Sequence, residues 1–312
     1  MRRRRLGSSG LRVSRLGLGT FTWGTLIDEE TCRDLLVAYV EAGGSLLDTA
    51  HAYGVGTAER MLGSLIGDVV AREDVTICTK AGITRRGEAR VEDTSRGALL
   101  DQLDQSLRHL GTDHLDLWLV HLWDDDTSLD ETMSALEYAV SSGRTRYVGV
   151  SNYSGWQSAR AFSLLESARI PLVANEIEYS LVRRDPEDEV VPAARSLGFG
   201  LLPWSPLGGG VLTGKYRSGV PSGSRATLSQ YRASFADYLT ERNLTIADAV
   251  CTAAAGLGVT PTEVALAWVR DRPGVTAPIV GAKTPPQLRA ALASEDLDLP
   301  TALVEALEEV SD

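Results

Sequence analysis

The stretch LLDTAHAYG, residues 46–54, joins an apolar run to two side chains that can exchange protons. The run stops at Asp48, and Tyr53 follows five residues later. In a parallel α/β protein the C-terminal end of a buried strand opens onto the face that binds ligands. We therefore expect Asp48, at a strand end, and Tyr53, in the next loop, to converge on one site.

The same arrangement recurs twice further along the chain. An apolar run at 75–79 is followed by Lys80, and another at 115–120 is followed by His121. Three successive strand candidates thus each deliver an ionisable group at the C-terminal end. Because the carboxyl ends of parallel strands share one face, the sequence predicts a single cluster of four side chains: Asp48, Tyr53, Lys80 and His121.

Apolar runs and amphipathic segments alternate along the rest of the chain. Asp28, Asp93 and Ser154 stand where helix N-caps are expected. Apolar residues at i, i+3 and i+4 predict helices at about 28–42, 57–70, 93–110, 130–142, 155–168, 186–197 and 261–271. Apolar runs predict strands at about 16–19, 45–48, 75–79, 115–120, 146–150, 172–175, 199–203 and 278–281.

Eight strand candidates with crossover helices predict a single α/β domain over 1–312, folded as a (β/α)8 TIM barrel. An N-terminal β-hairpin at about 2–13 is placed to close its bottom, and helical spacing after Pro300 predicts an extra C-terminal helix. A doubly wound open sheet is the alternative. That fold normally carries a GxGxxG turn after its first strand, whereas here Gly17 and Gly19 are followed by glycine only at position 24.

The composition limits the class of protein. Of 312 residues, 43% are hydrophobic and 23% charged, which is enough apolar material for a sizeable core. A formal net charge of -11 argues against nucleic acid as a partner, because the only dense basic run is 2–5. No apolar signal segment follows that run, and no run is long enough to span a membrane. Three cysteines without CxxC spacing fit a reducing compartment, so we expect a cytoplasmic protein.

The four predicted strand-end groups suit proton transfer to a carbonyl oxygen as a hydride reaches its carbon. Free tyrosine, with a pKa of roughly 10, donates a proton weakly at neutral pH. A Lys80 ammonium beside it favours the phenolate and lowers the pKa of Tyr53, and Asp48 keeps the ammonium charged. Singly, each group has a structural interpretation: Asp48 as a cap, Tyr53 as packing, Lys80 as a solvated charge and His121 as a core histidine.

A metal site is another interpretation of the same region. His51 and His121 with Asp48 offer ligand atoms, but the chain has no HxxxH or HxH pair. A lysine in the cluster would also repel the ion. We therefore predict no metal.

Several short segments around the cluster form a pattern: DTAHAYG at 48–54 with Glu59 and Gly63, Thr79-Lys80, LDL at 115–117 through His121, and Gly143-Arg144 through GVSN at 149–152. They resemble the aldo-keto reductases, and the resemblance runs from Gly19 to about Leu292. It implies a (β/α)8 barrel that binds NADP(H) without a Rossmann motif and reduces carbonyl compounds with Tyr53 as general acid. It also implies that Lys80 and Asp48 tune the tyrosine and that His121 orients the substrate.

The resemblance assigns further residues to the cofactor. Ser151 and Asn152 match the pair that holds the nicotinamide carboxamide, and Trp204 matches the ring that stacks on the nicotinamide. Glu176 stands where glutamine is usual, and a carboxylate accepts hydrogen bonds but cannot donate them. The other implied contacts lie along the pyrophosphate and the adenosine phosphate: Ser205, Leu207, Gly210, Lys215, Gly281, Lys283 and Gln287.

Two departures in the adenosine segment bear on the choice between NADP and NAD. Lys283 stands where arginine is common, and Ala291 replaces an asparagine that contacts adenine. Lysine is cationic but lacks the planar fork of arginine. The resemblance therefore supports a preference for NADP less firmly here than in the wider family.

The segment 207–240 is rich in glycine and serine and is too long for a plain connection, so we expect a cofactor-binding loop or lid. Its part GGVLTGK, at 209–215, fits seven positions of a P-loop, and an NTPase is therefore an alternative. Tyr216, however, stands where that motif needs serine or threonine. Backbone amides of such a loop suit the phosphates of a dinucleotide equally well.

Three residues are expected to line an apolar mouth above Tyr53 and His121, which favours an aryl or bulky aliphatic carbonyl substrate: Trp23, Val55 and Trp123. A nucleotide-linked keto sugar is the alternative substrate, and the sequence leaves the oligomeric state open. Some members of this wider group are accessory subunits of membrane channels. A slow-turnover NADP(H)-binding regulatory subunit is therefore the alternative function.

Overall fold

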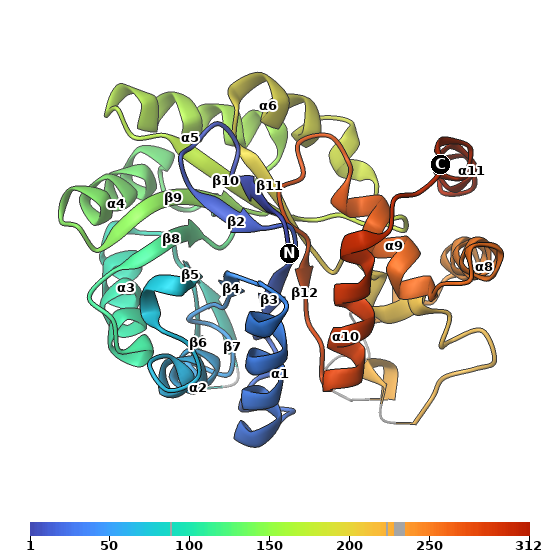
Figure 1. Ribbon diagram of the computed structural model, residues 1–312. Helices are drawn as coiled ribbons and strands as arrows, with labels where there is room; N and C mark the ends of the chain where they lie inside the picture. The colour runs from blue at the N-terminus through green and yellow to red at the C-terminus, as the bar shows by residue number, and fades with distance from the viewer. Residues whose placement is uncertain (88, 223, 228–234) are drawn as a thin grey trace.

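The structure, a computed structural model, describes residues 1–87, 89–222, 224–227 and 235–312. Eight parallel strands follow one another around a barrel, with helices on the outside (Figure 1). The last strand, β12 (Ile279–Val280), pairs with the first, β3 (Gly17–Gly19). Just before β12, the Thr276 N–H donates at 2.8 Å to the carbonyl of Leu201 in β11 (Gly200–Trp204). The predicted (β/α)8 barrel is therefore confirmed. Its strands are β3 (Gly17–Gly19), β4 (Leu46–Asp48), β5 (Thr76–Ala81), β8 (Leu115–Val120), β9 (Thr145–Ser151), β10 (Leu172–Glu178), β11 (Gly200–Trp204) and β12 (Ile279–Val280).

Most of the described helices begin at a polar residue whose side chain accepts a backbone hydrogen bond. The predicted caps Asp28 and Ser154 do so. The sequence predicts Asp93 as a third cap, but Ser95 takes that role and Asp93 instead accepts from the Ser95 N–H. The helices are α1 (Glu29–Glu41), α2 (Thr57–Leu65), α3 (Arg96–Leu110), α4 (Leu129–Ser141), α5 (Gly155–Ser167), α6 (Val190–Leu197), α8 (Glu241–Leu257), α9 (Pro261–Arg270), α10 (Pro285–Ala293) and α11 (Thr301–Val310).

An N-terminal hairpin closes the lower end of the barrel, as predicted. It consists of β1 (Arg3–Arg5) and β2 (Arg12–Ser14). Leu6 and Val13 are fully buried and belong to one apolar cluster with side chains of the barrel strands. Gly7 has a φ of +57°, and a Cβ there would lie 2.3 Å from the carbonyl oxygen of Gly198. This end of the barrel is therefore packed, which leaves the opposite end for ligands.

Three elements of the structure, two helices and a hairpin, are not predicted from the sequence. Helices α8 and α10 are among them. Three of the six buried residues of α8 are alanine and one is the polar Asn243, so its apolar stripe is weak. The third is a hairpin of β6 (Ile83–Arg86) and β7 (Ala89–Glu92), inserted directly after β5. The predicted C-terminal helix is present as α11, which packs against α8.

Within the described part of the chain, no single helix is long and apolar enough to cross a membrane. Helices α8 and α9 reach that length and composition only together, and they meet at a bend of 103°.

Candidate active site

Three charged side chains meet inside the C-terminal end of the barrel, from β4, β5 and β10. Lys80 Nζ lies 2.6 Å from Asp48 Oδ1 and 3.1 Å from Glu176 Oε2. It also donates to the Thr49 carbonyl at 3.0 Å. The exposed fractions of the Lys80, Asp48 and Glu176 side chains are 1%, 3% and 2%. Solvent therefore screens these interactions very little.

Burial and pairing oppose each other in this cluster. For Lys80, burial disfavours the ammonium, but Asp48 and Glu176 outweigh it and raise the pKa well above its ordinary value. For Glu176, burial and the Asp48 charge raise the pKa well above its usual range, and Lys80 offsets only part of the rise. Lys80 is therefore a cation, and burial and Asp48 shift the titration of Glu176 toward higher pH.

Tyr53 and His121 lie next to the buried charges and are partly exposed. Their ring centroids are 6.0 Å apart with the rings nearly perpendicular. Lys80 Nζ lies 5.3 Å from the centroid of the Tyr53 ring. The structure thus brings together the four predicted strand-end side chains, and it adds Glu176 to them.

The net pKa shift of Tyr53 differs from the direction that the sequence predicts. Burial raises the pKa above its ordinary value of 10.0, the Lys80 charge opposes this, and the carboxylates of Asp48 and Glu176 add to the rise. The predicted lowering by Lys80 is present, but burial and the carboxylates, which that prediction leaves out, outweigh it.

His121 is neutral at pH 7. Burial and the positive charges of Lys80 and Arg90 lower its pKa well below the ordinary 6.5. Its Nδ1 is buried and has no hydrogen-bond partner among the described residues. A neutral imidazole donates from one nitrogen and accepts at the other. The ring can therefore donate to a substrate oxygen without carrying charge.

The loop that carries Tyr53 is anchored to the neighbouring strand and contains strained backbone. The His51 N–H donates to the Lys80 carbonyl at 3.1 Å. Gly54 and Val55 have φ angles of +57° and +55°. The left-handed conformation costs a residue with a Cβ roughly 1–2 kcal/mol. Strain is thus stored next to the tyrosine.

A second hydrogen-bond network joins the ends of β9, β10 and β11. Asn152 donates to the His121 carbonyl at 2.9 Å and accepts from Trp204 Nε1 at 2.9 Å. Ser151 Oγ donates to the Glu176 carbonyl at 2.9 Å. The residues that the resemblance assigns to the nicotinamide are therefore tied to one another and to the cluster.

A family model described as "Aldo/keto reductase family" matches residues 15–312. The chain belongs to the aldo/keto reductase family. It is 36% identical to the "Uncharacterized oxidoreductase YrpG" of Bacillus subtilis (strain 168), over 98% of this chain and 94% of that protein. It is 34% identical to the "Probable voltage-gated potassium channel subunit beta" of Oryza sativa subsp. japonica, over 90% and 87%. It is also 34% identical to the "L-glyceraldehyde 3-phosphate reductase" of Escherichia coli O157:H7, over 92% and 86%.

In this aldo/keto reductase the segment after β11 is rich in left-handed backbone. Ser205 has a φ of +49°, and Gly210 has one of +97°. A Cβ at Gly210 would lie 2.7 Å from Lys215 Nζ, so glycine and lysine are in contact. Leu207 precedes the short helix η3 (Gly208–Thr213). Glycine-rich turns of this kind leave backbone amides open to anions.

The P-loop interpretation of this segment is not supported. Tyr216 is buried and contacts Phe235, and the described chain starts no helix at Lys215. The predicted cofactor loop at about 207–240 includes residues 223 and 228–234, which lie outside the described residues.

The third predicted cofactor segment follows β12. Gly281 is exposed, and Lys283 directly precedes Thr284, the N-cap of α10. The Lys283 N–H donates to Gln287 Oε1 at 2.9 Å, so the glutamine oxygen is already engaged. A cation beside a helix N-terminus suits a bound phosphate.

The structure places the three predicted substrate-lining residues in different surroundings. Trp23 is fully buried in the core, so its predicted place at an open mouth is wrong: its large apolar ring packs inside. Val55 is 52% exposed in the Tyr53 loop. Trp123 packs edge-on against Tyr153 and Trp156, with centroids 5.2 Å away in each case. Trp156, 50% exposed, is missed because in the sequence it reads as an ordinary position in α5.

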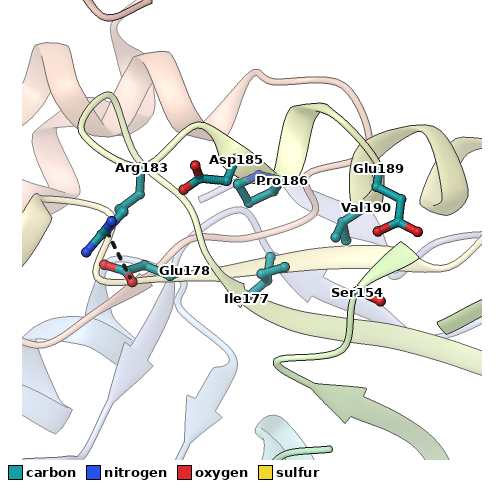
Figure 2. A pocket seen from close by; sticks show the side chains of 8 residues that line it. All are labelled: Ser154, Ile177, Glu178, Arg183, Asp185, Pro186, Glu189 and Val190. Atoms are coloured by element: carbon teal, nitrogen blue, oxygen red, sulfur yellow. Dashed lines mark ion pairs between the residues drawn. The ribbon is translucent and has the colours of Figure 1, made fainter. Parts of the chain in front are cut away.

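A cavity of about 320 Å³ lies between the end of β10 and the start of α6 (Figure 2). Ile177, Pro186 and Val190 supply its apolar side chains, and Arg183 pairs with Glu178 at 3.7 Å along its edge. The residues lining it do not include the four predicted acid–base side chains. It is therefore separate from the candidate reaction centre.

Asp48, Cys78 and Glu176 place ligand-type atoms within 4.8 Å of one another. Lys80 already contacts both carboxylates, and burial raises the pKa of the Cys78 thiol well above its ordinary value. A metal ion needs deprotonated ligands and no competing cation. These three residues therefore do not fit a metal site.

Proposed function

We propose that this protein reduces an aldehyde or ketone to an alcohol with a hydride from NADPH, and that Tyr53 is the general acid. The observation that carries the proposal is the arrangement of a partly exposed Tyr53 against the buried Lys80–Asp48 pair, beside a neutral His121. Family membership supports a small carbonyl compound as substrate. The three cysteines are free, which is consistent with the cytoplasmic location that we include in the proposal.

The residues present fit NADP(H). The exposed Asn152 amide and the partly exposed Trp204 ring suit a nicotinamide, and Glu176 Oε2 is buried without a hydrogen bond among the described residues. Gly210 has no side chain and lies against Lys215, which suits a pyrophosphate. Bound NADPH would supply the hydride. The residues that would hold it are Ser151, Asn152, Glu176, Trp204, Ser205, Leu207, Gly210, Lys215, Gly281, Lys283 and Gln287.

The chain's own residues would supply the proton. Neutral His121 would donate an N–H to the carbonyl oxygen and orient it. Tyr53 would give its hydroxyl proton to that oxygen as the new C–H bond forms, leaving a phenolate. Lys80 would stabilise the phenolate through its charge. Because the resting pKa of Tyr53 is raised, the hydroxyl holds its proton until the substrate takes it.

The test is the variant Tyr53→Phe. Its ring keeps the packing but has no proton to give, so we expect carbonyl reduction to fall by roughly 10²–10⁴ while NADPH binding changes little. Oxidation of NADPH with an aromatic aldehyde measures the first effect, and a fluorescence titration measures the second. Turnover at the wild-type rate in Tyr53→Phe would remove the assignment.

A second candidate is a regulatory or accessory subunit that binds NADP(H) and turns over slowly. The similarity to the "Probable voltage-gated potassium channel subunit beta" of Oryza sativa subsp. japonica favours it. The two functions differ in rate, because enzymes commonly turn over at about 1–10³ s⁻¹. A kcat in that range with any member of an aldehyde panel would support the reductase. Tight NADPH binding with turnover far below it across the panel would favour the subunit.

A further inference from the structure

Glu176 is one of three acceptors around a single ammonium. Lys80 has three N–H bonds. The acceptors near its Nζ include Asp48 Oδ1 at 2.6 Å, the Thr49 carbonyl at 3.0 Å and Glu176 Oε2 at 3.1 Å, and the Tyr53 ring lies beside it. The first two contacts are hydrogen bonds, whereas the third is an ion-pair contact whose angles do not make a hydrogen bond. Glu176 is thus the least well-satisfied member of the group.

The charges of this buried group do not balance if both carboxyls are ionised. The titratable side chains that face Glu176 are Asp48 from β4, Tyr53 from the loop after it, and Cys78 and Lys80 from β5. Tyrosine and thiol are neutral here, so two carboxylates would share one cation. Because an uncompensated buried charge is unfavourable, such a pair of carboxyls takes up one proton.

Asp48 holds the shorter contact with Lys80, so the proton belongs on Glu176. A carboxylic acid has an O–H, whereas a carboxylate only accepts. Protonation therefore gives this residue the donor that the glutamine usual at this position supplies with its amide.

We propose that Glu176 holds a proton in the resting protein and passes it through Lys80 to Tyr53 after each reduction. In this step an N–H bond of Lys80 breaks first, as the O–H bond of Tyr53 is restored. The Glu176 O–H bond then breaks as the missing N–H bond of Lys80 forms again. Lys80 ends as the ammonium that it was, and Glu176 ends as a carboxylate that water later protonates. The transfer of this proton to Tyr53 rests on the proposed function, whereas the presence of a proton on Glu176 in the resting protein does not.

The direction of the Glu176 pKa supports the resting proton, because burial and Asp48 raise it well above the ordinary 4.5. The distance of 3.1 Å between Glu176 Oε2 and Lys80 Nζ supports the transfer from Glu176 to Lys80, and the position of Lys80 Nζ 5.3 Å from the centroid of the Tyr53 ring supports the transfer from Lys80 to Tyr53.

Infrared spectroscopy of the full chain without cofactor at neutral pH tests the resting proton. Wild type should show the C=O band of a buried carboxylic acid, sensitive to deuterium, and Glu176→Gln should lack it. Asp48→Asn should lack it too, because Glu176 then pairs alone with Lys80 and ionises. Glu137→Gln, on the exposed outer side of α4, is the control and should keep the band. A wild type without the band, or a band kept by both Glu176→Gln and Asp48→Asn, would overturn the proposal. Circular dichroism confirms that each variant is folded.

Proton release tests the transfer. If Glu176 is a carboxylate in the product state, mixing wild type with NADP⁺ in weak buffer should release about one proton per site. NADPH should release none, and neither cofactor should release one from Glu176→Gln. Equal release by both proteins would overturn the transfer. Fluorescence titration of both cofactors separates this result from a failure of the proposed function: a protein that binds neither cofactor refutes NADP(H) use and leaves the infrared result standing.

Discussion

The two sides of the barrel's C-terminal end hold their charges differently. On the side of β4, β5 and β10, Asp48, Lys80 and Glu176 are buried and contact one another. On the side of β11 and β12, Lys215 is exposed and Lys283 is partly exposed, within glycine-rich or helix-capping segments. Buried pairs keep one geometry and feel little screening, whereas exposed cations are screened by salt. Catalysis is therefore expected from the first side and cofactor affinity from the second.

The largest effect should come from removing the buried cation. Lys80→Met deprives both carboxyls of their partner and removes the charge that stabilises a Tyr53 phenolate. We expect kcat/KM to fall by roughly 10²–10⁴, the range for acid catalysis. Affinity for NADPH, measured by fluorescence titration, should change little. A loss of affinity as large as the loss of rate would contradict the division between the two sides.

A smaller effect is expected on the exposed side, from Lys283→Glu. A hydrogen bond to a charged phosphate contributes roughly 1.5–3 kcal/mol, which is about one to two decades of affinity for NADPH over NADH. The variant should lose or invert that preference. In wild type the preference should shrink as salt rises, because the contact is screened.

Lys215→Glu is the matched control for Lys283→Glu. It alters a cation that would face the pyrophosphate, which both cofactors share, so it should weaken NADPH and NADH alike. Dissociation constants for the two cofactors at low and high ionic strength decide the matter. If Lys283→Glu keeps the wild-type preference for NADPH over NADH, Lys283 does not bind the adenosine phosphate.

Protonation of His121, on the buried side, makes the free energy of unfolding depend on pH. Its pKa in the folded protein lies below the ordinary 6.5, so the unfolded chain binds this proton more readily. The stability that comes from keeping the ring neutral is fully present above pH 6.5 and is lost as the pH falls below it. We expect His121→Asn to lose less stability than wild type between neutral and mildly acidic pH, in urea titrations. Parallel losses in the two proteins would show that other groups set the slope.

The smallest expected effect concerns the strained loop. Asparagine adopts the left-handed conformation more readily than valine, so Val55→Asn should raise the free energy of unfolding by about 0.5–1 kcal/mol. Val37 in α1, 37% exposed, offers the control. Val37→Asn has no such strain to relieve and should not stabilise. A destabilised Val55→Asn would show that the valine side chain matters more than its backbone.

The parts of this site that the sequence predicts are those carried by strand ends. Asp48, Lys80 and His121 each close an apolar run, and parallel strands bring such ends together. The contact between Glu176 and Lys80 is not predictable in that way, because β10 and β5 are not neighbours in the sheet and the two side chains meet across the barrel. The hairpin of β6 and β7 is missed because ITRRGEARVE, at 83–92, has the charge density of a surface loop. Trp23 is misplaced because a sequence does not show toward which side a loop residue turns.

The pairing of β3 with β12 bears on how the chain is made. It joins Gly17 and Leu18 to Ile279 and Val280, so the barrel cannot close until nearly the whole chain has left the ribosome. Until then β3 has an unpaired edge, and open edges invite pairing with other chains. That edge is only three residues long and two of them are glycine, which limits what it can attract. Lengthening β3 with β-forming residues would therefore be expected to increase aggregation during synthesis before it altered the finished fold.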